Sequence, residues 1–337
     1  MNGRQTADDA LSPLPSIAVI IVNYGTAQLA LDAAASALAQ DLPGRRLHVH
    51  LVDNASPGTD AAHLGAEIAA RGWQDRVTFW PEQINHGFGR GNNVVLSALA
   101  QAAKAPDYVL LLNPDAVLEA DALSRLAALL DRRPEVTGVG AGISQPDGRP
   151  VTAAFRFPSA LGEFEATACF GPVSRFLHRH RIPLPPDHPE GPVDWVAGAA
   201  VLFRFSALRA VGFFDPAFFL YFEEVDLMRR LQAQAGPIWY LPTARVRHIE
   251  GASTGVQSGI HRPRPAYWFD SWHLYHRRAG GRPRALATAL AHLAGALVNI
   301  AQTRLRGARP LLPPRHLRDF TALALRPLLS AERPSHD

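Results

Sequence analysis

A carboxylate that could hold a cation follows a run of five consecutive apolar residues. Asp115 comes directly after the run Tyr108–Leu112 and the turn signal Asn113-Pro114. Such a run is typical of a strand buried on both faces, and open α/β sheets bind ligands at the carboxyl ends of their strands. Asp115 could therefore bind a divalent cation and, through it, a diphosphate. The alternative is a turn or helix-capping aspartate.

A second set of carboxylates lies at the start of a helical pattern, directly after an aromatic run. These are Glu223, Glu224 and Asp226. Apolar surroundings raise the pKa of a carboxyl group, which suits a general base. The simpler interpretation is that acids at a helix N-terminus are favoured by the helix dipole.

Two further segments could contact a diphosphate or its cation. The glycine-rich segment Asn85–Asn93 leads into a helix and could present backbone N–H groups to a phosphate. It does not match the dinucleotide-binding fingerprint, and a plain tight turn is the alternative. His248 follows the acidic cluster and could complete a metal site, because neutral imidazole suits Mn²⁺ and similar ions. A structural histidine is the alternative.

Alternating strands and helices must position these residues. The expected strands are Ile17–Val22, Leu47–Val52, Val77–Trp80 and Tyr108–Leu112, and the expected helices are 27–40, 60–71, the stretch after the glycine-rich segment to Ala103, and 120–132. This alternation predicts βαβ units and an α/β fold with a mostly parallel sheet. Beyond about residue 138 the alternation weakens. We expect a long loop region over 155–192, a strand near 194–204 and an edge strand over 238–246.

The C-terminal part of the chain is strongly basic. From Val256 to Asp337 there are 13 arginines against 4 acids, whereas the whole chain has a net charge of +4. Within it, Ala285–Thr303 is uncharged, and its larger apolar residues fall on one helical stripe; these are Leu286, Leu290, Leu293, Leu297 and Ile300. We expect an amphipathic helix that packs its stripe on the enzyme, on a partner or in the membrane interface. A true span is disfavoured because alanine dominates and polar residues interrupt the run.

The remaining composition bounds the compartment and the partners. Cys169 is the only cysteine, so an internal disulfide is excluded and a reducing, cytoplasmic compartment is favoured. Residues 1–16 lack the apolar core of a signal peptide, and we expect a short disordered leader there. The basic extension carries no recognised nucleic-acid-binding motif, so nucleic acid is not an expected partner.

Several short motifs together resemble the family-2 glycosyltransferases of the GT-A fold, and most closely their bacterial rhamnosyltransferase-like branch. The resemblance covers about residues 17–255. Its motifs are Val-Asn-Tyr-Gly-Thr at 22–26, Val-Asp-Asn-Ala-Ser at 52–56, the Asn85–Asn93 segment, Asn113-Pro114-Asp115, Trp195–Ala199, Phe213-Phe214-Asp215 with the run 222–227, and His248 with Gly251 and Ser253.

The resemblance implies a role for each of these residues. Those that would bind the nucleotide are Asn23, Tyr24, Asp53, Asn54, Ser56, Asn85, Gly87, Gly89, Asn92 and Asn113. Asp115 matches the last acid of the family's metal-binding Asp-x-Asp signature, and His248 matches the second metal ligand, for Mg²⁺ or Mn²⁺. Glu224 matches the catalytic base, which is usually Asp, so Glu223 and Asp226 stay alternatives. Trp195, Gly198 and Ala199 would border the donor or acceptor sugar.

The function implied is an inverting, metal-dependent transfer of a sugar, rhamnose first, from a nucleoside diphosphate to a hydroxyl group. The expected partners are dTDP-rhamnose or a UDP-sugar, and a cell-surface glycan or lipid-linked acceptor. The enzyme would work in the cytoplasm, with peripheral membrane contact through its extension. We expect a leader at 1–16, a transferase domain at 17–255 with nucleotide-binding (17–116) and catalytic (117–255) halves, and a helical extension at 256–337. The alternatives are a sugar nucleotidyltransferase and an inactive nucleotide-binding scaffold protein.

Overall fold

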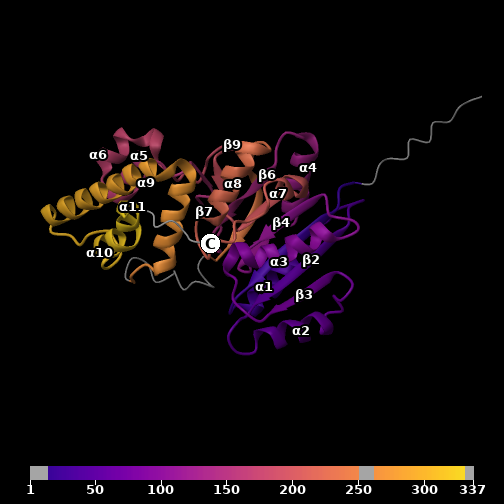
Figure 1. Cartoon of the computed structure of the whole chain (residues 1–337). Helices are drawn as coiled ribbons and strands as arrows, with labels where there is room; N and C mark the ends of the chain where they lie inside the picture. Colours follow the sequence, from indigo (N-terminus) through magenta and orange to yellow (C-terminus); the bar gives the residue numbers. More distant parts are fainter. Residues whose placement is uncertain (1–13, 250–261, 331–337) are drawn as a thin grey trace, which may run out of the picture.

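One large mixed sheet forms the centre of the molecule in the computed structural model, which describes residues 14–249 and 262–330 (Figure 1). Its strands lie in the order β3-β2-β1-β4-β11-β6-β12-β5. Their bounds are β1 Ile17–Asn23, β2 Leu47–Asn54, β3 Val77–Glu82, β4 Tyr108–Leu112, β5 Ala116–Leu118, β6 Gly138–Ser144, β11 Ala200–Arg204 and β12 Ile238–His248. Strands β1 to β4 are parallel, whereas β11 is antiparallel to both β4 and β6. The expected α/β fold is confirmed.

Helices cover both faces of this sheet. One face packs against α1 (Ala27–Leu38), α2 (Asp60–Ala70) and α4 (Ala122–Arg132). The other packs against α3 (Gly87–Gln101), α7 (Phe205–Ala210) and α8 (Glu223–Gln234). Alternate residues of β4 enter the two cores, which explains why that strand reads as continuously apolar. With both faces covered, a ligand can be expected at the carboxyl ends of the strands, as in other open α/β sheets.

The glycine-rich segment is mostly helical, and not the loop that we expected. Helix α3 begins at Gly87, whose φ is +74°, and a Cβ at this position would lie 1.8 Å from the carbonyl oxygen of Phe219. A Cβ at Gly89 would lie 3.1 Å from Cβ of Phe214 and 3.2 Å from its ring, and one at Gly91 would lie 3.0 Å from the Val22 side chain. These glycines therefore allow close packing of the helix.

The expected long loop over 155–192 contains regular structure. Helix α5 (Ala160–Ala168) is capped by Ser159, whose Oγ accepts a hydrogen bond from the Gly162 N–H at 3.2 Å. It is followed by α6 (Gly171–Phe176) and the short helix η1 (His178–His180). The sequence conceals α5 because its buried positions include Glu163, Glu165 and Thr167, so the helix lacks an apolar stripe.

The prediction that residues 238–246 form an edge strand is also wrong. Strand β12 pairs with β6 on one side and with β5 and β9 (Gly191–Val193) on the other, so it lies inside the sheet. Pro242 suggested an edge because it cannot donate a ladder hydrogen bond. In the structure it falls in the irregular stretch between Leu241 and Arg245, where the register shifts.

The C-terminal helices pack beside α5, at the far end of the molecule from α2 and β3 (Figure 1). Helix α9 (Ala266–Leu305) is interrupted at Gly280 and Gly281. The short segments α10 (His316–Phe320), η3 (Thr321–Leu325) and α11 (Arg326–Leu329) fold back onto it. The predicted helix is present, but its packed face is not centred on the expected leucine stripe, since Leu290 and Leu297 are 54% and 59% exposed. Residues 1–13 of the expected leader lie outside the described residues.

Candidate active site

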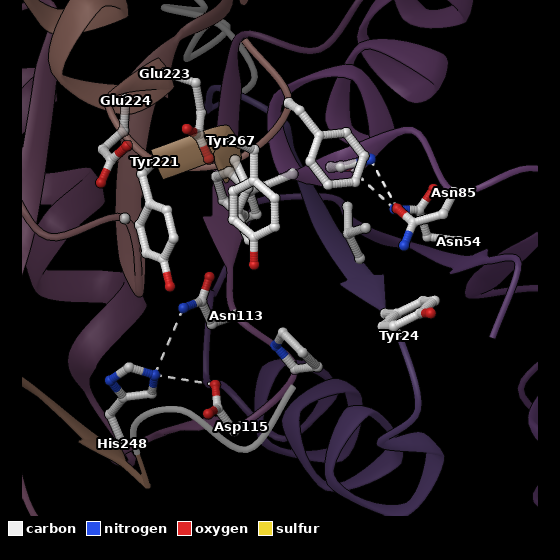
Figure 2. A pocket seen from close by; sticks show the side chains of 17 residues that line it. Tyr24, Asn54, Asn85, Asn113, Asp115, Tyr221, Glu223, Glu224, His248 and Tyr267 are labelled. Carbon is white, nitrogen blue, oxygen red and sulfur yellow. Dashed lines mark hydrogen bonds and ion pairs between the residues drawn. The ribbon is translucent and has the colours of Figure 1, made fainter. Parts of the chain in front are cut away.

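A cavity of about 540 Å³ lies at the carboxyl ends of β1, β2 and β4, bordered by the start of α8 and the start of α9 (Figure 2). Strand ends, the starts of α3, α8 and α9 and the turns beside them supply its lining. The lining residues are Val22, Tyr24, Asn54, Asn85, Gly87, Phe88, Asn113, Pro114, Asp115, Gly198, Phe219, Leu220, Tyr221, Glu223, Glu224, His248 and Tyr267. The structure thus brings together residues from all seven motifs that carry the resemblance.

One wall of the cavity carries the candidate metal ligands. Asp115 follows β4 and His248 ends β12, and Nε2 of the imidazole lies 3.0 Å from Oδ1 of the carboxylate. Asn113 brings its amide nitrogen to 3.5 Å from the same imidazole nitrogen. Among the described residues no group of three His, Cys, Asp or Glu side chains could enclose a metal ion. The pair therefore suits a cation that completes its shell with phosphate oxygens and water.

The opposite wall carries the candidate base. Glu223 and Glu224 open α8, and the Oε2 atom of each is buried without a hydrogen-bond partner among the described residues. Burial and the neighbouring Glu224 carboxylate raise the pKa of Glu223 well above its usual value. Burial also raises the pKa of Glu224. Because two adjacent buried carboxyls resist losing both protons, one of them can stay protonated while the other accepts a proton.

A third part of the cavity is rimmed by amides and an aromatic ring. Asn54, at the end of β2, donates to the Asn85 side chain and to the Gly87 carbonyl oxygen, both at 3.1 Å. Its own carbonyl accepts from the backbone N–H of His86 at 3.0 Å, so this one side chain fixes the turn that starts α3. Tyr24, after β1, is 37% exposed at the rim (Figure 2).

Other expected nucleotide ligands lie behind the cavity wall. Asn23 donates to Asp53 at 2.9 Å and to Ser56 at 3.1 Å, and both Asn23 and Asp53 are almost completely buried. These contacts stabilise the carboxyl ends of β1 and β2. Gly89 and Asn92 are buried within α3, where the Asn92 side chain donates to the Phe88 carbonyl oxygen at 3.0 Å.

Three expected catalytic or sugar-binding residues also lie outside the lining. Asp226 is 1% exposed and forms ion pairs with Arg229 at 3.1 Å and Arg230 at 2.7 Å. Trp195 stacks on Phe155 with ring centroids 4.0 Å apart. Ala199 is buried, and its carbonyl oxygen accepts the Asn113 N–H at 2.9 Å, which orients the turn before Asp115. Gly251 and Ser253 fall outside the described residues.

Two tyrosines that were not among the expected residues direct their hydroxyl groups into the cavity (Figure 2). Tyr221 precedes α8 with a φ of +71°, and its ring stacks on that of Tyr267 at 6.0 Å. Tyr267 belongs to α9, and the same helix supports the Tyr221 turn because Ser271 donates to the Leu220 carbonyl oxygen at 2.9 Å. The aromatic run before Glu223 signalled Tyr221, but no pattern signalled Tyr267, which lies beyond the resemblance.

The comparisons with known proteins agree with this geometry. The chain is 31% identical over 226 residues to N-acetylglucosaminyl-diphospho-decaprenol L-rhamnosyltransferase of Mycobacterium tuberculosis, covering 64% of this chain and 71% of that protein. It is 26% identical over 166 residues to rhamnosyltransferase WbbL of Escherichia coli, covering 48% and 61%. The fold resembles mannosyltransferase PcManGT of Pyrobaculum calidifontis in complex with GDP-Man and Mn²⁺, with a TM-score of 0.55, 18% identity, and 94% and 82% coverage.

The family assignment rests on a match over most of the chain. The profile described as "Glycosyltransferase like family 2" matches residues 15–264, which include every strand that borders the cavity. The expected family is therefore confirmed, and a sugar nucleotidyltransferase is disfavoured. This chain belongs to glycosyltransferase family 2 and is a glycosyltransferase of GT-A fold.

Proposed function

We propose that this chain transfers rhamnose from dTDP-rhamnose to a hydroxyl group of a lipid-linked N-acetylglucosamine diphosphate, with inversion at the anomeric carbon. The observation that carries the proposal is one cavity with an Asp115–His248 pair on one wall and a buried glutamate pair on the other. Both curated relatives named above are rhamnosyltransferases, and the name of the mycobacterial one specifies the lipid-linked acceptor.

The donor would lie across the ends of the parallel strands, where open α/β sheets bind nucleotides. The amides of Asn54 and Asn85 and the ring of Tyr24 suit a pyrimidine nucleoside, because they offer hydrogen bonds and a stacking surface. The diphosphate would then extend toward Asn113 and Asp115. A UDP-sugar is the alternative donor, and the experiment below distinguishes the two.

Asp115 and His248 would hold Mg²⁺ or Mn²⁺ against the diphosphate. When bound, the cation would stabilise the negative charge that develops on the leaving nucleoside diphosphate. The carboxylate and the imidazole are separated by 3.0 Å, and both face the cavity, which suits shared binding of one ion with substrate oxygens. Their role in this chain is to position the donor so that its anomeric carbon faces the glutamates.

Glu224 would act as the general base. It removes the proton of the acceptor hydroxyl, whose oxygen forms a bond to the anomeric carbon as the bond to the phosphate oxygen breaks. The nucleoside diphosphate leaves with that electron pair, and the configuration inverts in a single displacement. Glu223, whose pKa is raised further, keeps its proton and so leaves Glu224 as the ionised member of the pair. No covalent intermediate is required.

The deciding experiment is transfer by the purified full-length chain. We expect dTDP release and a rhamnosylated product when dTDP-rhamnose, Mn²⁺ or Mg²⁺ and a short-chain prenyl-diphosphate N-acetylglucosamine are present together. UDP-galactose, UDP-N-acetylglucosamine and GDP-mannose serve as competing donors, and NMR of the product identifies its anomeric configuration. The proposal would be contradicted if the chain used one of the competing donors and not dTDP-rhamnose, or if the product retained the anomeric configuration of the donor. An inactive chain that still binds dTDP would favour the scaffold alternative.

A further inference from the structure

The second half of α9 has two faces of opposite character. Its packed face carries small and polar residues, which are Ala285, Thr288, Ala289, His292, Gly295, Ala296, Asn299, Gln302 and Thr303. This face is held on α5, where Thr167 donates to the His292 carbonyl oxygen at 2.9 Å and receives a hydrogen bond from Asn299 on its own carbonyl oxygen at 3.1 Å. A Cβ at Gly295 would lie 2.2 Å from Oγ1 of Thr167, so the two helices are in close contact.

The outer face of the same helix is exposed and apolar. It consists of Ala287, Leu290, Ala294, Leu297, Ala301 and Leu305, a row that recurs every three or four residues. Leu290, Leu297 and Leu305 are 54%, 59% and 90% exposed, although leucine is among the residues most often buried. Because the hydrogen bonds to α5 fix the rotation of the helix, these leucines cannot turn inward. We call this row the outer face of α9.

Arginines stand at both ends of this outer face. Exposed Arg282 and Arg284 precede the uncharged stretch 285–303, and exposed Arg304, Arg306 and Arg309 follow it. Over residues 262–330 there are 12 arginines and only 2 acids. A helix that lies in a membrane interface has an apolar face toward the acyl chains and cations at the level of the phosphates. The outer face of α9 and its flanking arginines have this arrangement.

The same features disfavour both the pairing of two copies along this face and a membrane-spanning role for the helix. If two copies paired, parallel or antiparallel, the arginine clusters of one copy would meet those of the other, and like charges repel. Within the described ranges, α9 is the helix that is long and apolar enough to cross a membrane. Crossing, however, would strip His292 and Asn299 from their partners on α5 and expose them to hydrocarbon.

We propose that the outer face of α9 lies flat on an anionic lipid bilayer, with Leu290, Leu297 and Leu305 inserted below the phosphates and the flanking arginines bound to them. This inference rests on the proposed function, because a membrane-bound surface is useful to an enzyme whose acceptor is linked to a lipid. It also explains how the site is presented to such an acceptor, since the N-terminal half of α9 supplies Tyr267 to the cavity. The helical segment that contacts lipid would thus be joined, through the interruption at Gly280 and Gly281, to the segment that forms part of the active-site wall.

Vesicle flotation of the full-length chain tests the proposal without donor or acceptor. We expect binding to phosphatidylcholine vesicles that contain about 25% phosphatidylglycerol, and weak binding to phosphatidylcholine alone. The double variant Leu290→Asp/Leu297→Asp should lower partitioning at least about tenfold, because it places two charges on the inserted face. Leu14→Asp/Ile84→Asp is the matched control, since it changes two similarly exposed apolar residues on the sheet domain.

A second pair of variants tests the charges. Arg304→Gln/Arg309→Gln should weaken binding to the anionic vesicles by about fivefold for each arginine. Arg46→Gln/Arg132→Gln, at exposed positions away from α9, should leave binding unchanged. Equal flotation of the leucine variant and the wild type would overturn the proposal. A wild-type dimer in sedimentation analysis that Leu290→Asp/Leu297→Asp converts to a monomer, without flotation of either, would also overturn it in favour of a second copy.

Failure of this proposal and failure of the proposed function give different results. Transfer to a short-chain acceptor in detergent-free solution needs no bilayer, so Leu290→Asp/Leu297→Asp should keep the wild-type rate there. The same variant should lose transfer to an acceptor embedded in anionic vesicles. A chain that floats with anionic vesicles but transfers no rhamnose would contradict only the proposed function.

Discussion

The Nδ1 atom of His292 lies 2.7 Å from Oε2 of Glu163, a residue 129 positions away in the sequence. On its other side, His292 brings Nε2 to 2.8 Å from Nε2 of His316, so one proton must be shared between these two rings. Burial would raise the pKa of Glu163, but the imidazoles of His276 and His292 lower it below its usual value. This buried row joins α5, both halves of α9 and α10.

Acidification should destabilise the C-terminal helices. Burial, with His292 and Arg264 nearby, lowers the pKa of His316 to about 3, whereas an unfolded histidine titrates near about 6.5. Since the unfolded chain then binds more protons, the free energy of unfolding falls as pH drops below about 6.5, by up to about 1.4 kcal/mol per pH unit. The lowered pKa of Glu163 adds a further loss below about pH 4.5, where the unfolded carboxyl becomes protonated. Thermal unfolding between pH 8 and pH 4, followed by tryptophan fluorescence, measures this slope.

A matched pair of variants assigns the slope to this row. His316→Gln keeps a side chain that can hydrogen-bond His292 but removes a group that titrates, so its slope between about pH 6.5 and pH 4.5 should be shallower than that of the wild type. His178→Gln, at an exposed position in η1, should keep the wild-type slope. Identical slopes in all three proteins would show that the row does not control acid stability.

Removing the proton acceptor of Glu224 should abolish most of the transfer activity. Glu224→Gln keeps the shape of the side chain but cannot accept the proton, and loss of a general base typically costs about 10²-fold to 10⁴-fold in rate. Calorimetric affinity for dTDP should change less than about threefold, because the carboxylate faces the acceptor side of the cavity. Wild-type kcat in Glu224→Gln would assign the base to another residue.

Replacing Glu223 should have a different effect, which separates the two glutamates. Because burial and Glu224 raise the pKa of Glu223 well above its usual value, Glu223→Gln mimics the protonated side chain, and its rate should stay within about tenfold of the wild type. Because Glu223 is already neutral when Glu224 loses its proton, Glu223→Gln should leave the pKa of Glu224 unchanged. The acidic limb of the kcat/KM profile should therefore keep its position, and a clear shift to lower pH would contradict this assignment because it would show that Glu223 carries a charge.

Asp226→Asn should reduce stability more than catalysis. Its carboxylate pairs with Arg230, whose guanidinium also donates to the carbonyl oxygens of Val211 and Phe213, both at 2.7 Å. Breaking a buried ion pair costs about 3 kcal/mol or more, which urea unfolding would measure. Asp32→Asn, on exposed α1 surface, is the control. Loss of activity at full stability would instead favour Asp226 as a catalytic residue.

The nucleotide-binding half of the fold could be predicted because its signals are local. Strands buried on both faces read as apolar runs, and polar residues directly after them, such as Asn113 and Asp115, must lie at the open edge of a parallel sheet. The family resemblance added Asn54 and His248, and both line the same cavity. Asn23 and Asp53 follow this pattern too, yet they turn away from the cavity to bond each other, and no sequence pattern reports that choice.

The rest of the site depends on contacts between distant segments. Tyr267 reaches the cavity only because α9 packs on the turn before α8, where Ser271 bonds the Leu220 carbonyl oxygen. The sequence did not predict helix α5 because polar residues form its interface with α9. One of them, Glu163, is buried there and has its hydrogen-bond partner, His292, on α9. The periodic spacing of apolar residues, from which a helix is predicted, cannot reveal an interface made of polar residues. For the same reason the leucines of α9 suggested the wrong packed face.

Asp115→Asn should weaken the metal-dependent part of nucleotide binding and little else. The amide keeps the size of the side chain but lacks the charge that attracts a divalent cation to the Asp115–His248 pair. Calorimetric affinity for dTDP in the presence of Mn²⁺ should fall at least about tenfold, whereas affinity in EDTA should match the wild type. Asp41→Asn, at an exposed position before β2, should behave as wild type in both conditions. His248→Gln should show a smaller loss in the same direction, since a neutral ligand contributes less than a carboxylate. If Asp115→Asn and the wild type bind dTDP equally well in Mn²⁺, Asp115 is not a metal ligand. If no cation strengthens dTDP binding by the wild type, the proposed role of the metal is wrong.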